Sequence, residues 1–500
     1  MRKILAFHFV VCFLQSTLPA QPGFNRIYDA AMIGNKSFDK IFVDQDTIIA
    51  FGVGYEPNSP QGIALAKMDS FGNLMAQNFI LDSLGDHLAM DFLRGNVIKT
   101  SKGYYAFFAD ILGRGATLLV QIDNKLNVQS AFELPDPDEG YTVFDNSILE
   151  THEGGFLISG LIARENFKYD GLVRRIDKYG NLLWFKYYGG YHTDEGFGSV
   201  LKINDNRFIL GGGDQARGSL WAIDSNGIVL DQKIIQQPIL TAINGLIHSE
   251  DGGLIARGHT YLGEGPWGSM SQAAIMKFDS ALQLEWMKSV GPSSTYYNNF
   301  LDIEKTPDGH YIVAGERTAY GDPSQPSDDW GGWLYKFSAQ GDSIWSRADN
   351  APPGYDATGE FVYGGVGVLS SGSIVAGGRG DIDNKFVGWV VKVTADGCLD
   401  TLFCQTSGVG EVMGNGENGS LQVFPNPAST SAEIYFQVPA PKDCRFLLYD
   451  LAGRLVHSEP LTEGASAHTL SLTNYPNGWY FVCITENGRV LAREKIAVLH

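Results

Sequence analysis

The hydrophobic positions of this chain gather in short segments that are separated by polar turns. Examples are TIIAFG (47–52), GFLISG (155–160) and SIVAGG (373–378), each rich in aliphatic, aromatic and small residues. These runs are short and are bounded by Gly, Asp or Ser, as strands usually are. Because they are nearly continuously apolar, we expect both faces of each strand to be buried. The pattern therefore predicts an all-β protein.

One unit built on this pattern occurs seven times. In RIDKYGNLLW (175–184), an apolar strand leads into a D-x-x-G turn and a further strand. The Asp side chain can accept backbone N–H groups of the turn, and the Gly can adopt the positive φ that the turn requires. The equivalent turn positions are Asp69, Asp123, Asp177, Asp224, Asp279, Ser338 and Thr394, followed three residues later by Gly in five copies: Gly72, Gly180, Gly227, Gly341 and Gly397.

Seven four-stranded units of about 50 residues are typical of a β-propeller. We therefore predict a seven-bladed β-propeller over residues 21–404. The segment FNRIYDAA (24–31) looks like a fourth strand without its first three, so we expect it to complete the last blade. A solenoid is the alternative, which the four-strand units and the lack of capping helices disfavour.

The chain changes character after residue 404. Residues 405–420 are rich in Gly, Asn and Ser and are predicted to be a flexible linker. Residues 421–500 contain short strands separated by Asn-Pro, Ala-Gly and Asn-Gly turns, which predicts a small Ig-like β-sandwich. An ordinary accessory module of this kind is one interpretation of the segment.

A more specific interpretation comes from four motifs: VFPNPAS (423–429), YDLAGRLV (449–456), YPNGWYFV (475–482) and KIAVLH (495–500). In this order they resemble the type A C-terminal sorting domain of the type IX secretion system. The resemblance implies secretion or display at the outer-membrane surface, with the secretion machinery as partner. The residues that carry the motif are Pro425, Asn426, Pro427, Asp450, Gly453, Arg454, Gly478, Tyr480 and Lys495.

The propeller repeat also has relatives in sequence. Over roughly residues 36–404 it resembles the delta-60-type repeats of exported bacterial proteins. It is similar to the Asp-box hairpin of sialidases as well, because Trp184 and Trp345 follow the turn. That box places its Gly two residues after Asp, whereas the interval here is three. Since the box is a structural turn, this similarity implies no activity.

The N-terminus predicts export. Arg2 and Lys3 precede an apolar run from Ile4 to Leu14 and small residues up to Ala20, so residues 1–20 are predicted to be a signal peptide. The run is too short to span a bilayer, and we expect no transmembrane segment after it. The net charge is −19, from 37 Lys and Arg against 56 Asp and Glu. That balance opposes binding of nucleic acid.

Removal of the signal peptide leaves four cysteines with more than one plausible pairing. Cys398 and Cys404 could bridge only if the chain turns between them, while Cys444 and Cys483 lie in separate predicted strands. No C-x-x-C spacing occurs, the His residues are scattered, and no catalytic or nucleotide-binding motif is present. We therefore predict no metal, cofactor or catalytic residue from the sequence.

Two long loops offer candidate binding residues. In the fifth and sixth units, HTYLGEGPWGSMSQ (259–272) and ERTAYGDPSQPSDDWGG (316–332) lengthen the link between the second and third strands. Exposed aromatic rings stack on sugars or hold peptides, and nearby polar groups orient them. The predicted ligand patch, for a glycan or a protein, consists of Trp267, Tyr296, Tyr297, Tyr320, Asp328, Asp329 and Trp330. The same residues could simply fix long loops to the blades.

Three functions fit these features. The preferred one is a non-catalytic binding module at the cell surface or outside the cell. The others are a propeller hydrolase or lyase acting on polysaccharide, and a purely structural surface or matrix component. An enzyme should show several acids and an Arg or His converging at one end of the central channel. A binding module should show a shallow, aromatic surface.

Overall fold

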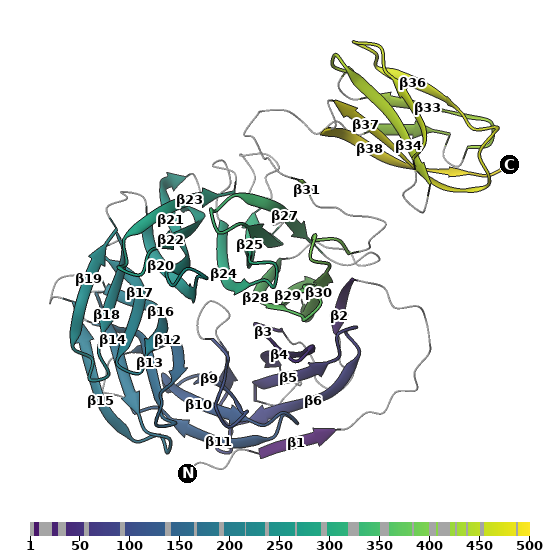
Figure 1. Ribbon diagram of the computed structural model, residues 1–500. Coiled ribbons are helices and arrows are strands. Elements are labelled where there is room, and N and C mark those ends of the chain that lie inside the picture. The colour runs from purple at the N-terminus through teal and green to yellow at the C-terminus, as the bar shows by residue number, and fades with distance from the viewer. Residues whose placement is uncertain are drawn as a thin grey trace. The chain divides into compact units, whose positions relative to one another are not determined.

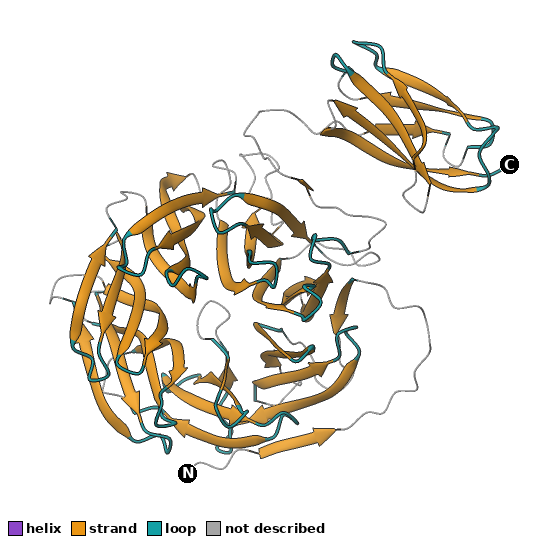
Figure 2. Ribbon diagram, viewed as in Figure 1, coloured by secondary structure: helices purple, strands orange, loops and turns teal. Residues whose placement is uncertain are grey.

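The computed structural model is organised as strands and connecting loops (Figure 2). The chain folds into two compact units, residues 1–410 and 411–500. No helix among the described residues is long and apolar enough to cross a membrane. The structure describes residues 5–9, 23–28 and 37–500, apart from 55–59, 91–95, 136–141, 165–167, 190–194, 216, 236–239, 266–267, 292–297, 319–329, 351–359, 383–384, 400–406, 409–420, 426–427, 437–438, 451–454 and 487–488.

The first unit is a seven-bladed propeller, as the repeats predicted (Figure 1). Each blade is an antiparallel sheet. In blades 1 to 6 the strands run outward from the axis in chain order, whereas the outermost strand of blade 7 is β2. Blade 1 contains β3 (Lys40–Asp44), β4 (Thr47–Gly54), β5 (Gly62–Met68) and β6 (Leu74–Leu81); blade 2 contains β7 (Leu88–Ala89), β8 (Ile98–Lys99), β9 (Tyr105–Ile111), β10 (Ala116–Ile122) and β11 (Val128–Glu133); blade 3 contains β12 (Val143–Glu150), β13 (Phe156–Ala163), β14 (Tyr169–Ile176) and β15 (Leu182–Tyr188).

The remaining blades follow the same plan. Blade 4 contains β16 (Glu195–Asn204), β17 (Arg207–Asp214), β18 (Arg217–Ile223) and β19 (Val229–Ile234); blade 5 contains β20 (Leu240–His248), β21 (Leu254–Gly265), β22 (Gly268–Phe278) and β23 (Leu284–Val290); blade 6 contains β24 (Asn298–Lys305), β25 (Tyr311–Thr318), β26 (Trp330–Phe337) and β27 (Ser343–Asp349); blade 7 contains β28 (Phe361–Val368), β29 (Ile374–Ile382), β30 (Lys385–Val393) and β2 (Phe24–Tyr28). The middle strands are buried on both faces, which explains their apolar composition.

All seven predicted turns have one geometry. Asp69 Oδ1 accepts the backbone N–H groups of Phe71 (2.9 Å) and Asn73 (2.8 Å), and Ser338 Oγ accepts those of Gln340 (3.2 Å) and Asp342 (3.1 Å). The third residue after the turn position has a positive φ in every copy, including the two where Gly is absent. Those two are Leu126 (φ 67°) and Leu282 (φ 61°).

The neighbouring blade explains where Gly stands and where Leu does. At Gly227 a Cβ atom would lie 2.8 Å from the Trp184 ring of the preceding blade, and at Gly341 one would lie 2.9 Å from Trp286. Before Leu126 the equivalent residue of the preceding blade is Ala76, and both belong to one apolar cluster. Burial of the Leu side chain, which is 0% exposed, offsets its strained backbone.

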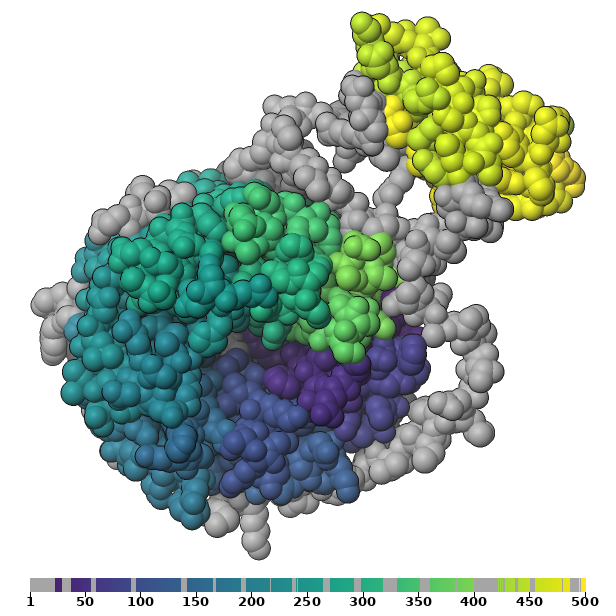
Figure 3. Space-filling view, viewed as in Figure 1, coloured from purple at the N-terminus to yellow at the C-terminus, as the bar shows by residue number. Residues whose placement is uncertain are grey.

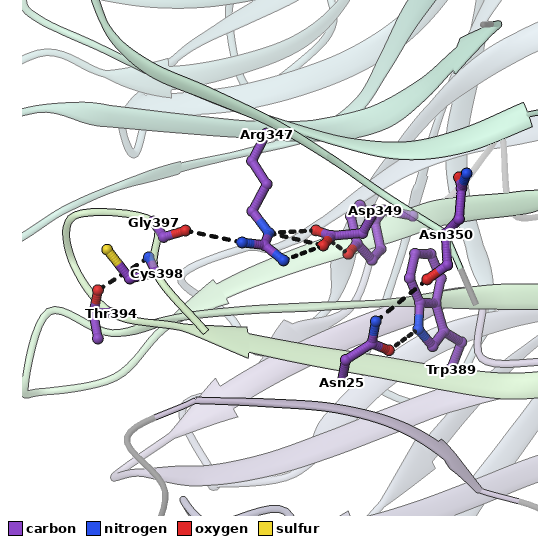
Figure 4. A network of polar contacts seen from close by, with 9 residues as sticks. Asn25, Arg347, Asp349, Asn350, Trp389, Thr394, Gly397 and Cys398 are labelled. Atoms are coloured by element: carbon purple, nitrogen blue, oxygen red, sulfur yellow. Dashed lines mark hydrogen bonds and ion pairs between the residues drawn. The ribbon is translucent and has the colours of Figure 1, made fainter. Parts of the chain in front are cut away.

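The ring closes as predicted, by a strand from the N-terminal side. β2 pairs antiparallel with β30, with Asn25 opposite Val391. Figure 4 shows the polar network beside it, in which Asn25 accepts the Trp389 Nε1–H (2.6 Å) and donates to Asn350 O (3.3 Å). These bonds join the closing strand to blades 6 and 7, so closure is held by side chains as well as by the sheet.

Two further strands add to the propeller's outer edges. β1 (Leu5–Phe9) pairs with β6, and β31 (Ser407–Gly408) pairs with Trp345 and Ser346 of β27. β1 falls in the predicted signal peptide, and blade 1 has its four strands without it. β31 falls in the segment predicted to be a flexible linker, so part of that segment is in fact strand. An outermost strand offers unpaired backbone groups, which is why such pairing is favourable.

The structure distinguishes between the two cysteine pairings that the sequence left open. Cys398 forms a disulfide, while Cys444 and Cys483 do not. The sequence left a Cys444–Cys483 bridge open as one alternative, and the structure does not contain it. Cys444 pairs with Glu486 and Cys483 with Leu447, an offset of three residues along the two strands. Because side chains alternate with a period of two, that offset puts the two thiols on opposite faces of the sheet.

The second unit is a sandwich of two sheets. One contains β32 (Leu421–Phe424), β33 (Ser431–Phe436) and β36 (Ala467–Ser471); the other contains β35 (Leu455–Pro460), β34 (Cys444–Asp450), β37 (Gly478–Glu486) and β38 (Arg489–Val498). Alternating side chains such as Phe446, Leu448, Val482 and Ile484 form the core between them. The predicted sandwich fold is confirmed.

Candidate functional site

The innermost strands of five blades carry a bulge at the same level. The ladder shifts by one residue at Asn146, Gly198, Asn244, Leu301 and Gly364. A bulge leaves backbone groups outside the ladder and redirects a side chain. Four of the five bulged residues line a cavity on the propeller axis, which Gly364 does not.

This axial cavity has a volume of about 410 Å³ and is lined by the inner strands of blades 1 to 6. The space-filling view shows a hollow near the middle of the propeller face, between the purple and teal blades (Figure 3). Small-molecule sites usually measure about 300–1,000 Å³ and combine a few polar groups with apolar walls. The volume of the axial cavity falls in this range, but its wall is more polar than that of a usual site. The apolar residues that line it are Ile41, Phe42, Val97, Leu246, Val200 and Ile303.

One side of the cavity carries neutral polar groups that connect neighbouring blades. Asn96 Nδ2 donates to Ile148 O (3.0 Å), and Asn96 Oδ1 accepts Ile148 N–H (2.8 Å). Asn146 Nδ2 donates to Phe197 O (2.8 Å), and Ser147 Oγ accepts Val200 N–H (3.2 Å). Inner strands of adjacent blades do not share a ladder, so these side chains supply the hydrogen bonds between blades 2, 3 and 4.

The other side carries charge. Lys40 Nζ donates to Gly364 O (3.2 Å), and Arg257 Nη1 donates to Phe300 O (2.7 Å). Asp302 accepts the N–H groups of Val366 (2.9 Å) and Ile303 (2.9 Å) through its two oxygens. Burial raises the pKa of Asp302, against the opposing effect of Lys40 and Arg257. Two cations and one carboxyl therefore converge on this side of the axis.

His259 and Glu304 complete the set of titratable groups in the cavity. Burial and the Arg257 charge lower the pKa of His259, so its ring is neutral near pH 7; Asn244 Nδ2 lies 3.1 Å from its Nδ1. The surrounding protein and Asp302 raise the pKa of Glu304, although its side chain still reaches solvent. Within the described parts of the chain, no group of three His, Cys, Asp or Glu residues could hold a metal ion.

The predicted ligand patch lies almost wholly outside the described residues. Only the backbone of Trp330 is described, where it begins β26 opposite Thr318. The other members, Trp267, Tyr296, Tyr297, Tyr320, Asp328 and Asp329, lie outside the described residues. The patch therefore stays a prediction.

Residues of the sorting motif are described in part. Tyr480 is buried, and its hydroxyl donates to Pro476 O (2.9 Å). Pro425 follows β32, and Gly478 begins β37. Asp450 and Lys495 lie in β34 and β38, whereas Asn426, Pro427, Gly453 and Arg454 lie outside the described residues.

The sequence did not single out the charged residues of the cavity, although the repeats contain a signal. Arg257 stands in the second strand just before a Gly that most blades share, in GLIARG (253–258). No other copy has a charge at this position, where the residues are Phe51, Phe108, Ser159, Gly211, Ala314 and Gly377. A charge at a single copy of an otherwise apolar or small position is the mark that could have pointed to the site.

Comparison with known proteins supports the assignment of the tail. Residues 422–498 match the family described as "Secretion system C-terminal sorting domain". This domain directs the protein through the type IX secretion system to the cell surface or the extracellular space, and its partner there is the secretion machinery. No curated protein matches the chain in sequence.

Solved structures with similar folds share little sequence with this chain. A Penicillium chrysogenum alpha-L-arabinanase complexed with arabinobiose is 13% identical, with 60% of this chain and 92% of that one covered and a TM-score of 0.40. A Streptococcus pneumoniae NanB sialidase mutant is 12% identical (76% and 71% covered, TM-score 0.39). The polysaccharide lyase Uly1 is 10% identical (76% and 94% covered, TM-score 0.38). At these levels the similarities carry no information about activity here.

Proposed function

We propose that this type IX-secreted propeller is a non-catalytic binding module that takes a small polar ligand, of the carbohydrate class, in its axial cavity. The observation that carries the proposal is the 410 Å³ cavity with amide, hydroxyl and charged side chains on its wall. Amides and charged groups can pair with the hydroxyls of a sugar, while the apolar wall residues contact its ring faces. Export of the precursor by the predicted signal peptide, residues 1–20, belongs to the same proposal.

The loop patch predicted from the sequence is a second binding site under this proposal. Its aromatic residues would suit a longer glycan or a protein segment. The similarity of the repeats to delta-60-type repeats fits a protein that works outside the cell, and it adds no ligand. The cavity and the loop patch use different residues, so substitutions can test ligand binding at each site separately.

Calorimetric titration of the full chain with a panel of mono- and disaccharides tests the cavity. Replacing Leu301, a buried bulge residue on the cavity wall, with Trp fills the space and should abolish binding of a small sugar. The double variant Trp267→Ala, Trp330→Ala is the comparison and should bind normally. Binding that is lost in the loop variant and kept in Leu301→Trp would move the site to the loops. Failure of all sugars to bind would refute the carbohydrate proposal.

A polysaccharide hydrolase or lyase is the second candidate, because two acids, an Arg and a His line one cavity. That is the mixture we expected of an enzyme. Glycoside hydrolysis, however, needs two carboxyl groups on either side of the bond, and both oxygens of Asp302 already accept backbone N–H groups. Glu304 is then the carboxyl left to act. Release of reducing or unsaturated ends from a polysaccharide panel, abolished by Glu304→Gln, would favour this candidate over the binding module.

A further inference from the structure

Arg257 reaches the cavity from the second strand of blade 5 because the first strand leaves room for it. It lies opposite Gly245 of β20. A Cβ atom on Gly245 would lie 2.6 Å from Arg257 Nε and 2.8 Å from its Cγ, closer than such contacts permit. The backbone of Gly245 has no positive φ, so the space, and not the conformation, requires Gly there.

The guanidinium group of Arg257 is buried and donates few hydrogen bonds to the protein. The residue is 9% exposed, and its Nη1 donates a hydrogen bond to the Phe300 carbonyl. Its Nε finds no acceptor among the described residues. Burial lowers the pKa of Arg257 to about 10, and Asp302 opposes that shift. A guanidinium has five N–H donors, so most of the N–H groups of Arg257 make no hydrogen bond to a described residue.

The groups around Arg257 leave the site short of negative charge. Asp302 is the carboxyl whose charge acts on Arg257, but its oxygens accept hydrogen bonds from backbone N–H groups. Lys40, a second cation, shares the cavity wall. His259 is neutral, and Glu304 is exposed, so solvent screens its charge. An added anion would therefore be attracted to this side of the cavity.

We propose that the ligand of the axial cavity is a sugar acid, with its carboxylate bound by Arg257 and assisted by Lys40. This inference rests on the proposed carbohydrate function and narrows it to one class. The planar guanidinium matches a carboxylate with two parallel hydrogen bonds, and Arg is suited to such pairs. The hydroxyls would face the amide of Asn244 and the neutral side of the cavity, formed by Asn96, Asn146, Ser147 and Ser199.

Titration calorimetry of the full chain with galacturonate and with galactose tests this inference, since the two sugars differ at one carbon. We expect galacturonate to bind and galactose to bind about 10- to 100-fold more weakly, the range of a charge-assisted bond. Arg257→Met should weaken galacturonate binding by a similar factor, so that the two sugars bind this variant with similar affinity. Arg217→Met, which removes a more exposed arginine of β18, is the matched control and should change neither.

The outcomes separate this inference from the function on which it rests. Equal binding of both sugars, or undiminished galacturonate binding by Arg257→Met, would overturn the sugar-acid assignment and leave a neutral-sugar module standing. Absence of binding by either sugar, and by the wider panel, would overturn both. If Arg257→Met fails to fold, Arg257→Lys keeps the charge without the planar fork, and we expect galacturonate affinity between those of wild type and of galactose. The wild-type comparison of the two sugars tests the ligand class, and the Arg257 variants test the residue that binds the carboxylate.

Discussion

Arg174 and Arg257 are both buried in the propeller, at 2% and 9% exposure, but they are neutralised in different ways. Arg174 Nη2 bonds to both oxygens of Asp145, and Nη1 donates to Pro135 O (2.6 Å). Arg257 lies near Asp302 without such a bond, and its Nη1 donates to a carbonyl instead. Among the described residues Nε has no acceptor in either arginine, so the two differ in their contact with a carboxylate.

A second paired arginine strengthens the comparison. Arg347 Nε donates to both oxygens of Asp349 (2.8 Å each), and Nη1 donates to Gly397 O (3.3 Å), as Figure 4 shows. Tyr363 also donates to Asp349 (2.8 Å). In both pairs a carboxylate of the same blade neutralises the guanidinium group. Arg257 is a buried charge beside a cavity, and the protein does not pair it with a carboxylate in this way. A ligand carboxylate could supply the missing negative charge there.

The largest expected effect is the loss of a complete pair. Asp145→Ala leaves Arg174 charged and buried, which should lower the free energy of unfolding by about 3–5 kcal/mol. Urea unfolding followed by tryptophan fluorescence measures the change. Asp342→Ala, which removes an exposed partner of Lys288, should cost less than about 1 kcal/mol. Similar losses in the two variants would show that the Arg174–Asp145 pair is not the special contact described here.

A buried carboxyl without such a pair should give a pH effect of intermediate size. Burial raises the pKa of Glu316 to about 7, Glu360 adds to the rise, and Arg379 opposes it. Between about pH 4.5 and 7 the unfolded chain ionises Glu316 while the folded protein keeps the proton, so stability falls as pH rises, by up to about 3 kcal/mol.

Glu316→Gln should remove that slope, which urea unfolding at a series of pH values measures. The substitution keeps the shape of the side chain and deletes its titration. A slope that is unchanged in the variant would show that groups other than Glu316 cause the pH dependence.

The smallest expected effect is on the stability of the cavity itself. Arg257→Met removes a charge that the protein only partly neutralises, and Lys40 still faces Asp302. The free energy of unfolding should therefore change by less than about 1.5 kcal/mol. The same urea experiment measures it without ligand. A loss as large as that of Asp145→Ala would mean that Arg257 is part of the framework and not reserved for a ligand.

Much of the framework could be predicted from local sequence. The turn residues Asp, Ser and Thr bond to backbone two to four residues away, so the repeat itself predicts the turn. The closing strand β2 was found by the same comparison of repeats. Leu126 shows the limit, because the space for its side chain beside Ala76 of the preceding blade is not visible in the turn itself.

The candidate site could not be predicted in the same way. The sequence favoured long loops with aromatic residues, whereas the cavity residues are charged and lie within strands. Their access to the axis depends on bulges and on the missing side chain of Gly245, which the repeat pattern does not reveal. The sequence left a Cys444–Cys483 bridge open for a similar reason, since the register of two strands decided which faces the thiols occupy.

The sequence by itself determined the repeated blade, its turns and the sorting domain, because each depends on residues close together in the chain. Only the tertiary structure decided which polar residues meet at the axis. Lys40, Arg257 and Asp302 come from blades 1, 5 and 6, and closing the ring is what gathers them around one cavity. Charge interactions fall off with distance, so these three residues acquire a shared electrostatic environment only when the blades have assembled.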